Sequence, residues 1–162
     1  MLERIGKRIY YLMGEERTDR PCLYYIHGDN KNLVVDAGNS KIEYPDLSEI
    51  QVVTADIVLE EDMCLELGGI EARLLMRDST HSRDALFIHV PEERALIIGD
   101  ADCEDHYDGG GKHDKKKLEE LIAFFQTFDV DYYLVGHDQP QTVEEEKEFL
   151  EEALTKLEMT SR

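Results

Sequence analysis

The chain has 162 residues and a formal net charge of −19 at pH 7, with 41% hydrophobic and 34% charged residues. This composition is typical of a folded, soluble single domain that buries its own core, here residues 1–162, with N-terminal strands in 1–40 and the remaining elements in 41–162. So acidic a surface argues against nucleic-acid and anionic-lipid partners, whose binding depends on the opposite charge. No apolar run approaches the roughly 20 residues that cross a bilayer.

The N-terminus and the cysteines predict the compartment. No basic region followed by an apolar stretch opens the chain, so a secretory signal is not visible. The three cysteines, Cys22, Cys64 and Cys103, are an odd number at long spacing, which makes a disulfide framework unexpected. We therefore expect a cytoplasmic protein.

Most of the chain predicts short strands. Runs of aromatic, aliphatic and β-branched residues are separated by turn residues such as Gly28-Asp29-Asn30, and Gly68-Gly69 predicts a tight hairpin. A tight connection is also expected at Pro91–Arg94. The predicted strands lie at 8–12, 22–26, 32–35, 50–53, 57–59, 64–67, 70–75, 85–90, 95–98 and 132–135.

The last third of the chain predicts two helices. Leu118, Leu121, Ile122 and Phe125 recur at helical spacing and predict a helix that begins near Asp114. Thr142 and Glu145 have the spacing of a capping box, so a second helix is expected to begin there. The apolar face of this second helix is predicted to contain Val143, Leu150, Leu154 and Leu157.

Three good metal ligands each follow a predicted strand. His81 follows the strand that ends near Met76, and Asp100 and His137 each come directly after an apolar run and a glycine. Open sheets collect their functional sites at such strand ends, and a glycine allows a sharp turn and a close approach. Imidazole and carboxylate ligands together suit zinc, iron or manganese. Taken alone, each of these residues is more often an ordinary turn residue than a metal ligand. Taken together, the three residues make a metal site and the structural alternative about equally expected.

Four ordered motifs carry a resemblance to a known family. They are Val35-Asp36-Ala37-Gly38, Ser79-Thr80-His81-Ser82-Arg83-Asp84, Ile98-Gly99-Asp100 and Gly136-His137. Together they resemble the metallo-β-lactamase superfamily of metal-dependent hydrolases. The resemblance covers most of the chain. It implies an α/β fold, the αββα sandwich of that family, with a metal site at one edge of the sandwich.

One family motif is absent. The family's H-x-H-x-D-H motif, which supplies ligands to both metals, has no counterpart, because no histidine occurs between His27 and His81. The resemblance therefore implies a sandwich that is truncated in its first half. The resemblance leaves His81, Asp100 and His137 as ligands, with Asp100 as the catalytic carboxylate. It implies that Asp36, Ser82 and Asp84 support these ligands without binding the metal themselves. Three ligands suit one divalent ion, most simply zinc, better than two. His106 and His113 are more simply explained as exposed loop residues than as further ligands.

Two functions follow from the resemblance and remain open. The first is a hydrolase that acts on a small-molecule ester, thioester, lactam or phosphoester through a metal-bound water, with activity weakened by the reduced site. The second is a non-catalytic metal-binding or interaction domain that retains the scaffold. An internally shortened form of an active enzyme is a third reading. Loss of the family's covering helices would expose apolar side chains at 33–35 and 50–53, so we expect a homodimer that covers them.

Overall fold

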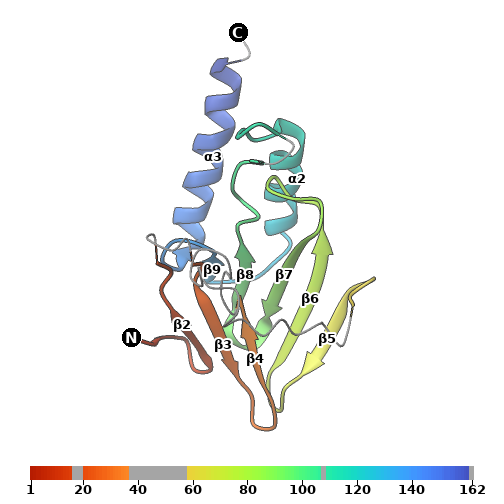
Figure 1. Cartoon of the computed structure of the whole chain (residues 1–162), viewed down its shortest axis with the longest axis vertical. Coiled ribbons are helices and arrows are strands. Elements are labelled where there is room, and N and C mark those ends of the chain that lie inside the picture. Colours follow the sequence, from red (N-terminus) through yellow and green to blue (C-terminus); the bar gives the residue numbers. More distant parts are fainter. Residues whose placement is uncertain (16–19, 37–57, 107–108, 161–162) are drawn as a thin grey trace, which may run out of the picture.

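Two β-sheets and two helices make up the described part of the chain (Figure 1). The computed structural model describes residues 1–15, 20–36, 58–106 and 109–160. The strands are β1 (Glu3–Ile5), β2 (Ile9–Leu12), β3 (Leu23–His27), β4 (Asn32–Val35), β5 (Met63–Glu66), β6 (Glu71–Arg77), β7 (Ala85–Val90), β8 (Ala95–Gly99), β9 (Tyr132–Val135) and β10 (Gln141–Thr142). The helices are α2 (Lys115–Phe125) and α3 (Val143–Thr160), and a 3₁₀ turn, η2, covers Pro91–Glu93.

The first sheet is an antiparallel meander with the order β1-β2-β3-β4. Its strands alternate between buried and more exposed side chains, as a sheet with one covered face should. Gly28 connects β3 and β4, and a Cβ atom there would lie 2.1 Å from the Leu67 carbonyl oxygen, so only glycine fits this close approach to the second sheet.

The second sheet has six strands in the order β10-β9-β8-β7-β6-β5. The Gly68-Gly69 hairpin joins β5 and β6 as predicted, with both glycines at positive φ. Strand β7 pairs antiparallel with both β6 and β8, and β8 pairs parallel with β9. Strands β6, β8 and β9 therefore run in the same direction, and their carboxyl ends lie at one edge of the sheet.

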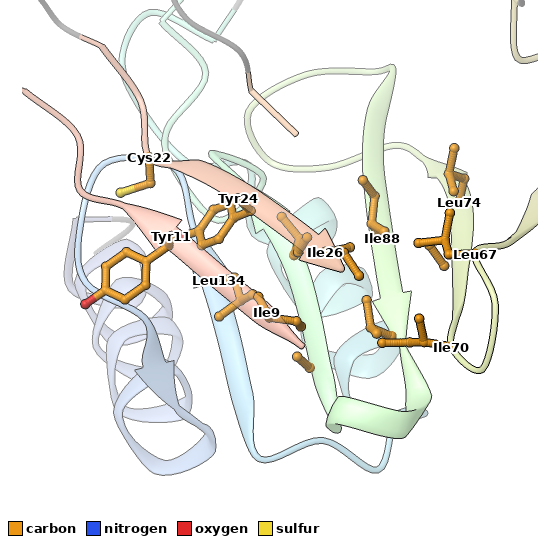
Figure 2. Packing of buried hydrophobic residues seen from close by; sticks show 14 residues of the cluster. Ile9, Tyr11, Cys22, Tyr24, Ile26, Leu67, Ile70, Leu74, Ile88 and Leu134 are labelled. Atoms are coloured by element: carbon orange, nitrogen blue, oxygen red, sulfur yellow. The ribbon is translucent and has the colours of Figure 1, made fainter. Parts of the chain in front are cut away.

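The main core lies between the two sheets. Ile9, Tyr24 and Ile26 of the first sheet face Ile88 and Leu134 of the second, and each of these side chains is buried (Figure 2). Burial of each large apolar side chain contributes about 1.5–3 kcal/mol. This layer holds the first sheet against the second and so positions the strand ends of both.

Both helices pack on the outer face of the six-stranded sheet, where a second core includes Phe87, Leu118, Phe125 and Leu150. Helix α2 begins as predicted, because the Asp114 side chain accepts a hydrogen bond from the Lys117 amide. Helix α3 begins after Thr142, also as predicted, and extends past the sheets as far as Thr160 (Figure 1). The mixed α/β arrangement of two packed sheets and few helices confirms the predicted fold class.

The structure differs from the sequence prediction in a few segments. Val58 and Leu59 are not in a strand, whereas the short strands β1 and β10 were not predicted, because they contain few apolar residues. The predicted strand at 50–53 lies outside the described residues. Val34, one of the side chains expected at a dimer interface, has 49% of its surface exposed, while Leu33 and Val35 pack partly against the core. No helix among the described residues is long and apolar enough to cross a membrane.

Candidate functional site

The three predicted ligands follow the three strands that run in the same direction. His81 lies in the loop after β6, Asp100 follows β8, and His137 follows β9 through Gly136. All three therefore lie at one edge of the six-stranded sheet. Strands β8 and β9 are neighbours, whereas β7 separates β6 from β8. Each of the three residues thus follows a strand, as the sequence indicates.

Asp100 and His137 are side by side. The His137 Nε2 and Asp100 Oδ2 atoms are 3.4 Å apart, and both side chains are partly open to solvent. The backbone supports this pair, because the Gly136 amide donates a hydrogen bond to the Gly99 carbonyl oxygen at 2.9 Å. A Cβ atom at position 136 would lie 2.0 Å from Asp100 Oδ1. Glycine is therefore required at 136 for the Asp100 carboxylate to occupy its place.

The first sheet holds the end of β9. The Tyr24 hydroxyl donates a buried hydrogen bond of 2.5 Å to the Val135 carbonyl oxygen. The Cys22 amide donates to the Gly136 carbonyl oxygen at 2.6 Å, and the Cys22 thiol to the Asp138 carbonyl oxygen at 3.3 Å. Residues before and after His137 are therefore hydrogen-bonded to β3 or to the residue that precedes it. The position of His137 thus depends on the packing of one sheet on the other.

Asp36 brings the end of the first sheet to the same pair. It follows β4 with φ of 55°, a left-handed conformation that is uncommon for residues other than glycine. Surrounding protein atoms raise the pKa of its carboxyl by desolvation, the charge of Asp100 raises that pKa further, and His137 lowers it. The side chain still has an exposed surface. Asp36 thus interacts electrostatically with both predicted ligands, from the strand end where the sequence placed a supporting residue.

His81 is attached to the loop after β8. Its Nδ1 atom lies 2.9 Å from the Glu104 carbonyl oxygen. A carbonyl oxygen only accepts, so Nδ1 carries the proton and Nε2 is the lone-pair nitrogen of the neutral ring. The Thr80 hydroxyl also lies 2.8 Å from the carbonyl oxygens of both Ala101 and Cys103. The loop of His81 and the loop of Asp100 are therefore one hydrogen-bonded unit.

The two other predicted supporting residues belong to the turn that presents His81. The Ser82 carbonyl oxygen accepts from the Ser79 amide, and the Ser79 hydroxyl oxygen accepts from the amides of His81 and Ser82. Ser82 thus stabilises the turn through its backbone, whereas Asp84 is exposed just before β7.

The described residues do not form a complete metal centre. No three of their His, Cys, Asp and Glu side chains converge in a way that could hold an ion. Asp100 and His137 have the right chemistry and lie close together, and His81 stays a predicted third ligand. His106 is exposed, and His113 Nε2 lies 2.8 Å from the Asp102 carbonyl oxygen. The expectation of an exposed loop residue is therefore wrong for His113, whose side chain is only 7% exposed because it packs into the loop that contains Asp102.

Two buried carboxyls near the strand ends were missed by the sequence analysis. A cavity of about 430 Å³ is lined by Asp100, His137, Asp102 and Glu146, among others. Asp102 is 6% exposed, and burial raises its pKa to about 6. Glu146, on α3, is 2% exposed, and burial followed by the charge of Asp102 raises its pKa to about 8. Glu146 lies three residues after Val143 on the apolar face of the predicted helix, and this spacing was the available signal.

Comparisons with known proteins identify the fold. No family model matches the sequence, and no curated protein matches it. Solved structures do match. One is a metallo-beta-lactamase from Pontibacter korlensis, with 8% identity and a TM-score of 0.65, covering 94% of this chain and 98% of that chain. Another is an archaeal metallo-beta-lactamase superfamily protein from Sulfolobus tokodaii, with 12% identity and a TM-score of 0.57, covering 94% and 86%. A variant of a flavo di-iron protein from Thermotoga maritima has 11% identity and a TM-score of 0.62, covering 95% and 62%. These likenesses show that the chain has the metallo-β-lactamase fold.

Proposed function

We propose that this chain is a metal-dependent hydrolase of the metallo-β-lactamase superfamily, acting on a small-molecule ester, thioester, lactam or phosphoester. The observation that carries the proposal is the contact between Asp100 and His137 at the ends of adjacent parallel strands. A carboxylate and an imidazole are ordinary ligands of divalent zinc, iron and manganese. The matched structures support the proposal through their fold.

Each residue of the candidate site would have a distinct role. Asp100 and His137 would hold one divalent ion, and His81 would complete the set through the ring nitrogen that does not face Glu104. A bound divalent ion acidifies a water molecule enough for it to act as a nucleophile near neutral pH. Asp36 would orient His137 by its charge, and Gly136 would leave room for the Asp100 carboxylate.

A second function is favoured by a specific observation. No complete ligand set of three is present among the residues that the structure describes, and the family's histidine-rich motif is absent from the sequence. Both observations favour a domain that binds a metal, or a protein partner, without catalysis. The two functions differ in whether hydrolysis follows metal binding.

Metal content measured by elemental analysis, together with a hydrolysis screen, separates these functions. We expect about one ion per chain, with zinc the first candidate, in protein incubated with zinc, manganese or iron and then dialysed. His137→Ala and Asp100→Asn should each lose the ion, and His81→Ala should weaken its binding. His27→Ala is the matched control. His27 is the last residue of β3, at the opposite end of the strand from Cys22, and it contacts Asn32.

The screen should then use ester, thioester, lactam and phosphodiester probes on the same proteins. Hydrolysis that is retained in His27→Ala and lost with the ion in His137→Ala supports the hydrolase. Bound metal without hydrolysis of any probe supports the non-catalytic domain. Protein that binds none of the three metals contradicts both forms of the metal proposal.

A further inference from the structure

Glu146 lies at the wall between two cavities. One is the cavity at the strand ends, and the other, of about 330 Å³, lies between α2 and α3. The walls of the second cavity are mainly apolar and aromatic, and include Phe125, Tyr133 and Leu150. Its size and its largely apolar lining are those of small-molecule sites. We refer to it as the interhelical cavity.

The Glu146 carboxyl lacks the hydrogen bond that burial demands. Its Oε1 atom is buried and has no hydrogen-bond partner among the residues that the structure describes. Leaving such a group unsatisfied costs about 1–3 kcal/mol, more if the group is charged. Native proteins rarely accept this cost without a reason, such as a role in catalysis or a bound ion. A ligand that donates a hydrogen bond to Glu146 would remove the cost once the carboxyl turns toward it, because Glu146 is only 2% exposed in this arrangement.

Within the described part of the chain, the groups around Glu146 offer it no positive partner. The charge of Asp102 raises the pKa of Glu146. Burial, and then the charge of Glu146, raises the pKa of Tyr133 to about 12. Asp129, Lys147 and Glu151 line the same cavity. Lys147 is the cation among them, and its ammonium lies 3.6 Å from Glu151 at the exposed surface of α3. The local charge therefore favours a cationic ligand.

We propose that the Glu146 carboxyl binds the ammonium group of an apolar primary amine whose hydrocarbon part lies in the interhelical cavity. An ammonium pairs with the ionised carboxyl, so the amine displaces the proton that burial keeps on Glu146 up to a pH of about 8. Hydrogen bonds between an ammonium and a carboxylate are about twice as strong as neutral ones, so above that pH an amine gains more here than an alcohol does. The stacked rings of Phe125 and Tyr133, 4.8 Å apart, provide aromatic surface for its apolar part. The proposal is independent of the metal site, because neither the cavity nor the carboxyl requires an ion.

The test is calorimetric titration of metal-free protein at about pH 9, where the Glu146 carboxyl is ionised. The titrants are 2-phenylethylamine and its uncharged analogue 2-phenylethanol. For so small a ligand, we expect a dissociation constant in the millimolar range or below for the amine. The alcohol should bind about tenfold more weakly, since it forms only a neutral hydrogen bond. This comparison needs no variant and so does not depend on how a substitution folds.

Variants then assign the carboxyl. Glu146→Gln should weaken amine binding about tenfold and leave alcohol binding nearly unchanged, because it removes only the charge. Glu148→Gln, two residues further along α3 and exposed, should bind the amine like the wild type. Methyl NMR signals of Ile122, Val143 and Leu150 should shift on amine addition, whereas those of Ile9 and Ile26, between the sheets, should not.

Three outcomes would overturn the proposal. They are the absence of saturable amine binding, equal binding of amine and alcohol to the wild type, and unchanged amine binding in Glu146→Gln. Shifts at Gly136 and His137 instead of the cavity methyl groups would place the amine at the strand ends and would also overturn it. Because the titration uses metal-free protein, none of these results bears on whether the chain is a metal-dependent hydrolase.

Discussion

Single residues show how burial changes the chemistry of a carboxyl. Glu146 is an ordinary polar residue in the sequence of α3, but the packing of α3 against the sheet leaves it 2% exposed. Burial and the charge of Asp102 raise its pKa to about 8. In the unfolded chain the same carboxyl has a pKa near 4.3. The folded protein therefore keeps a proton that the unfolded chain releases between these values.

This difference predicts how stability depends on pH. The contribution of Glu146 to the free energy of unfolding is fully present below about pH 4 and is lost as pH rises through about 8. At about 1.36 kcal/mol per pH unit, wild type should lose roughly 3 kcal/mol more than Glu146→Gln between pH 5.5 and 8.5. Urea denaturation of metal-free protein at several pH values measures this. Glu148→Gln should follow the wild type, and parallel profiles for Glu146→Gln and wild type would contradict the raised pKa.

At the scale of elements, the ends of the helices are determined by local sequence. The Thr142 amide donates to Glu145 Oε2 at 2.8 Å, and the Glu145 amide donates to the Thr142 hydroxyl oxygen at 3.3 Å. The hydrogen bond from the Thr142 amide also lowers the pKa of Glu145. This reciprocal pair satisfies amide groups that a helix start leaves without partners. It also sets where the face of α3 that bears Glu146 begins.

Removing the cap should destabilise the protein without changing its fold. Thr142→Ala is expected to lower the free energy of unfolding by about 1 kcal/mol, the usual cost of losing a capping side chain. Thr155→Ala is the matched control, because the Thr155 hydroxyl only donates to the Glu151 carbonyl oxygen within the exposed part of α3. Chemical denaturation compares the two variants. An equal effect of both substitutions would show that the capping box contributes nothing specific.

For the whole molecule, the packing of one sheet on the other determines the geometry of the site. His137 follows β9 of the second sheet, but the chain on both sides of it is hydrogen-bonded to Tyr24 of the first sheet and to Cys22 just before β3. Asp36 approaches the Asp100–His137 pair from the first sheet as well. The candidate site therefore depends on both layers.

Tyr24→Phe tests this dependence. It removes the buried hydrogen bond to the Val135 carbonyl oxygen, and we expect a loss of about 1–3 kcal/mol in the free energy of unfolding. Binding of zinc should weaken in the same variant, because the end of β9 that presents His137 loses an anchor. Tyr25→Phe is the control, since Tyr25 packs against Tyr10 and His27. Zinc affinity equal to that of wild type in Tyr24→Phe would show that the sheets position His137 by other contacts.

Local sequence patterns were sufficient to predict most of the helices and strands, and the candidate ligands that follow three of the strands. Short β-branched and aromatic runs, the Gly68-Gly69 hairpin and the caps at Asp114 and Thr142 are local signals, because the residues that produce each one are neighbours in the chain. Strand ends followed by His81, Asp100 and His137 were visible for the same reason. The strands β1 and β10 were missed because their pairing comes from a neighbouring strand and not from their own composition.

The sequence by itself thus determined the fold class, the two helices and the residues that follow the strands. Tertiary structure alone decided which of those residues meet. It placed His137 at 3.4 Å from Asp100, brought Asp36 to them from the other sheet, and buried Glu146 beside Asp102. The physical reason is that distances, burial and pKa values depend on contacts between segments far apart in the chain, which local patterns of residues do not encode.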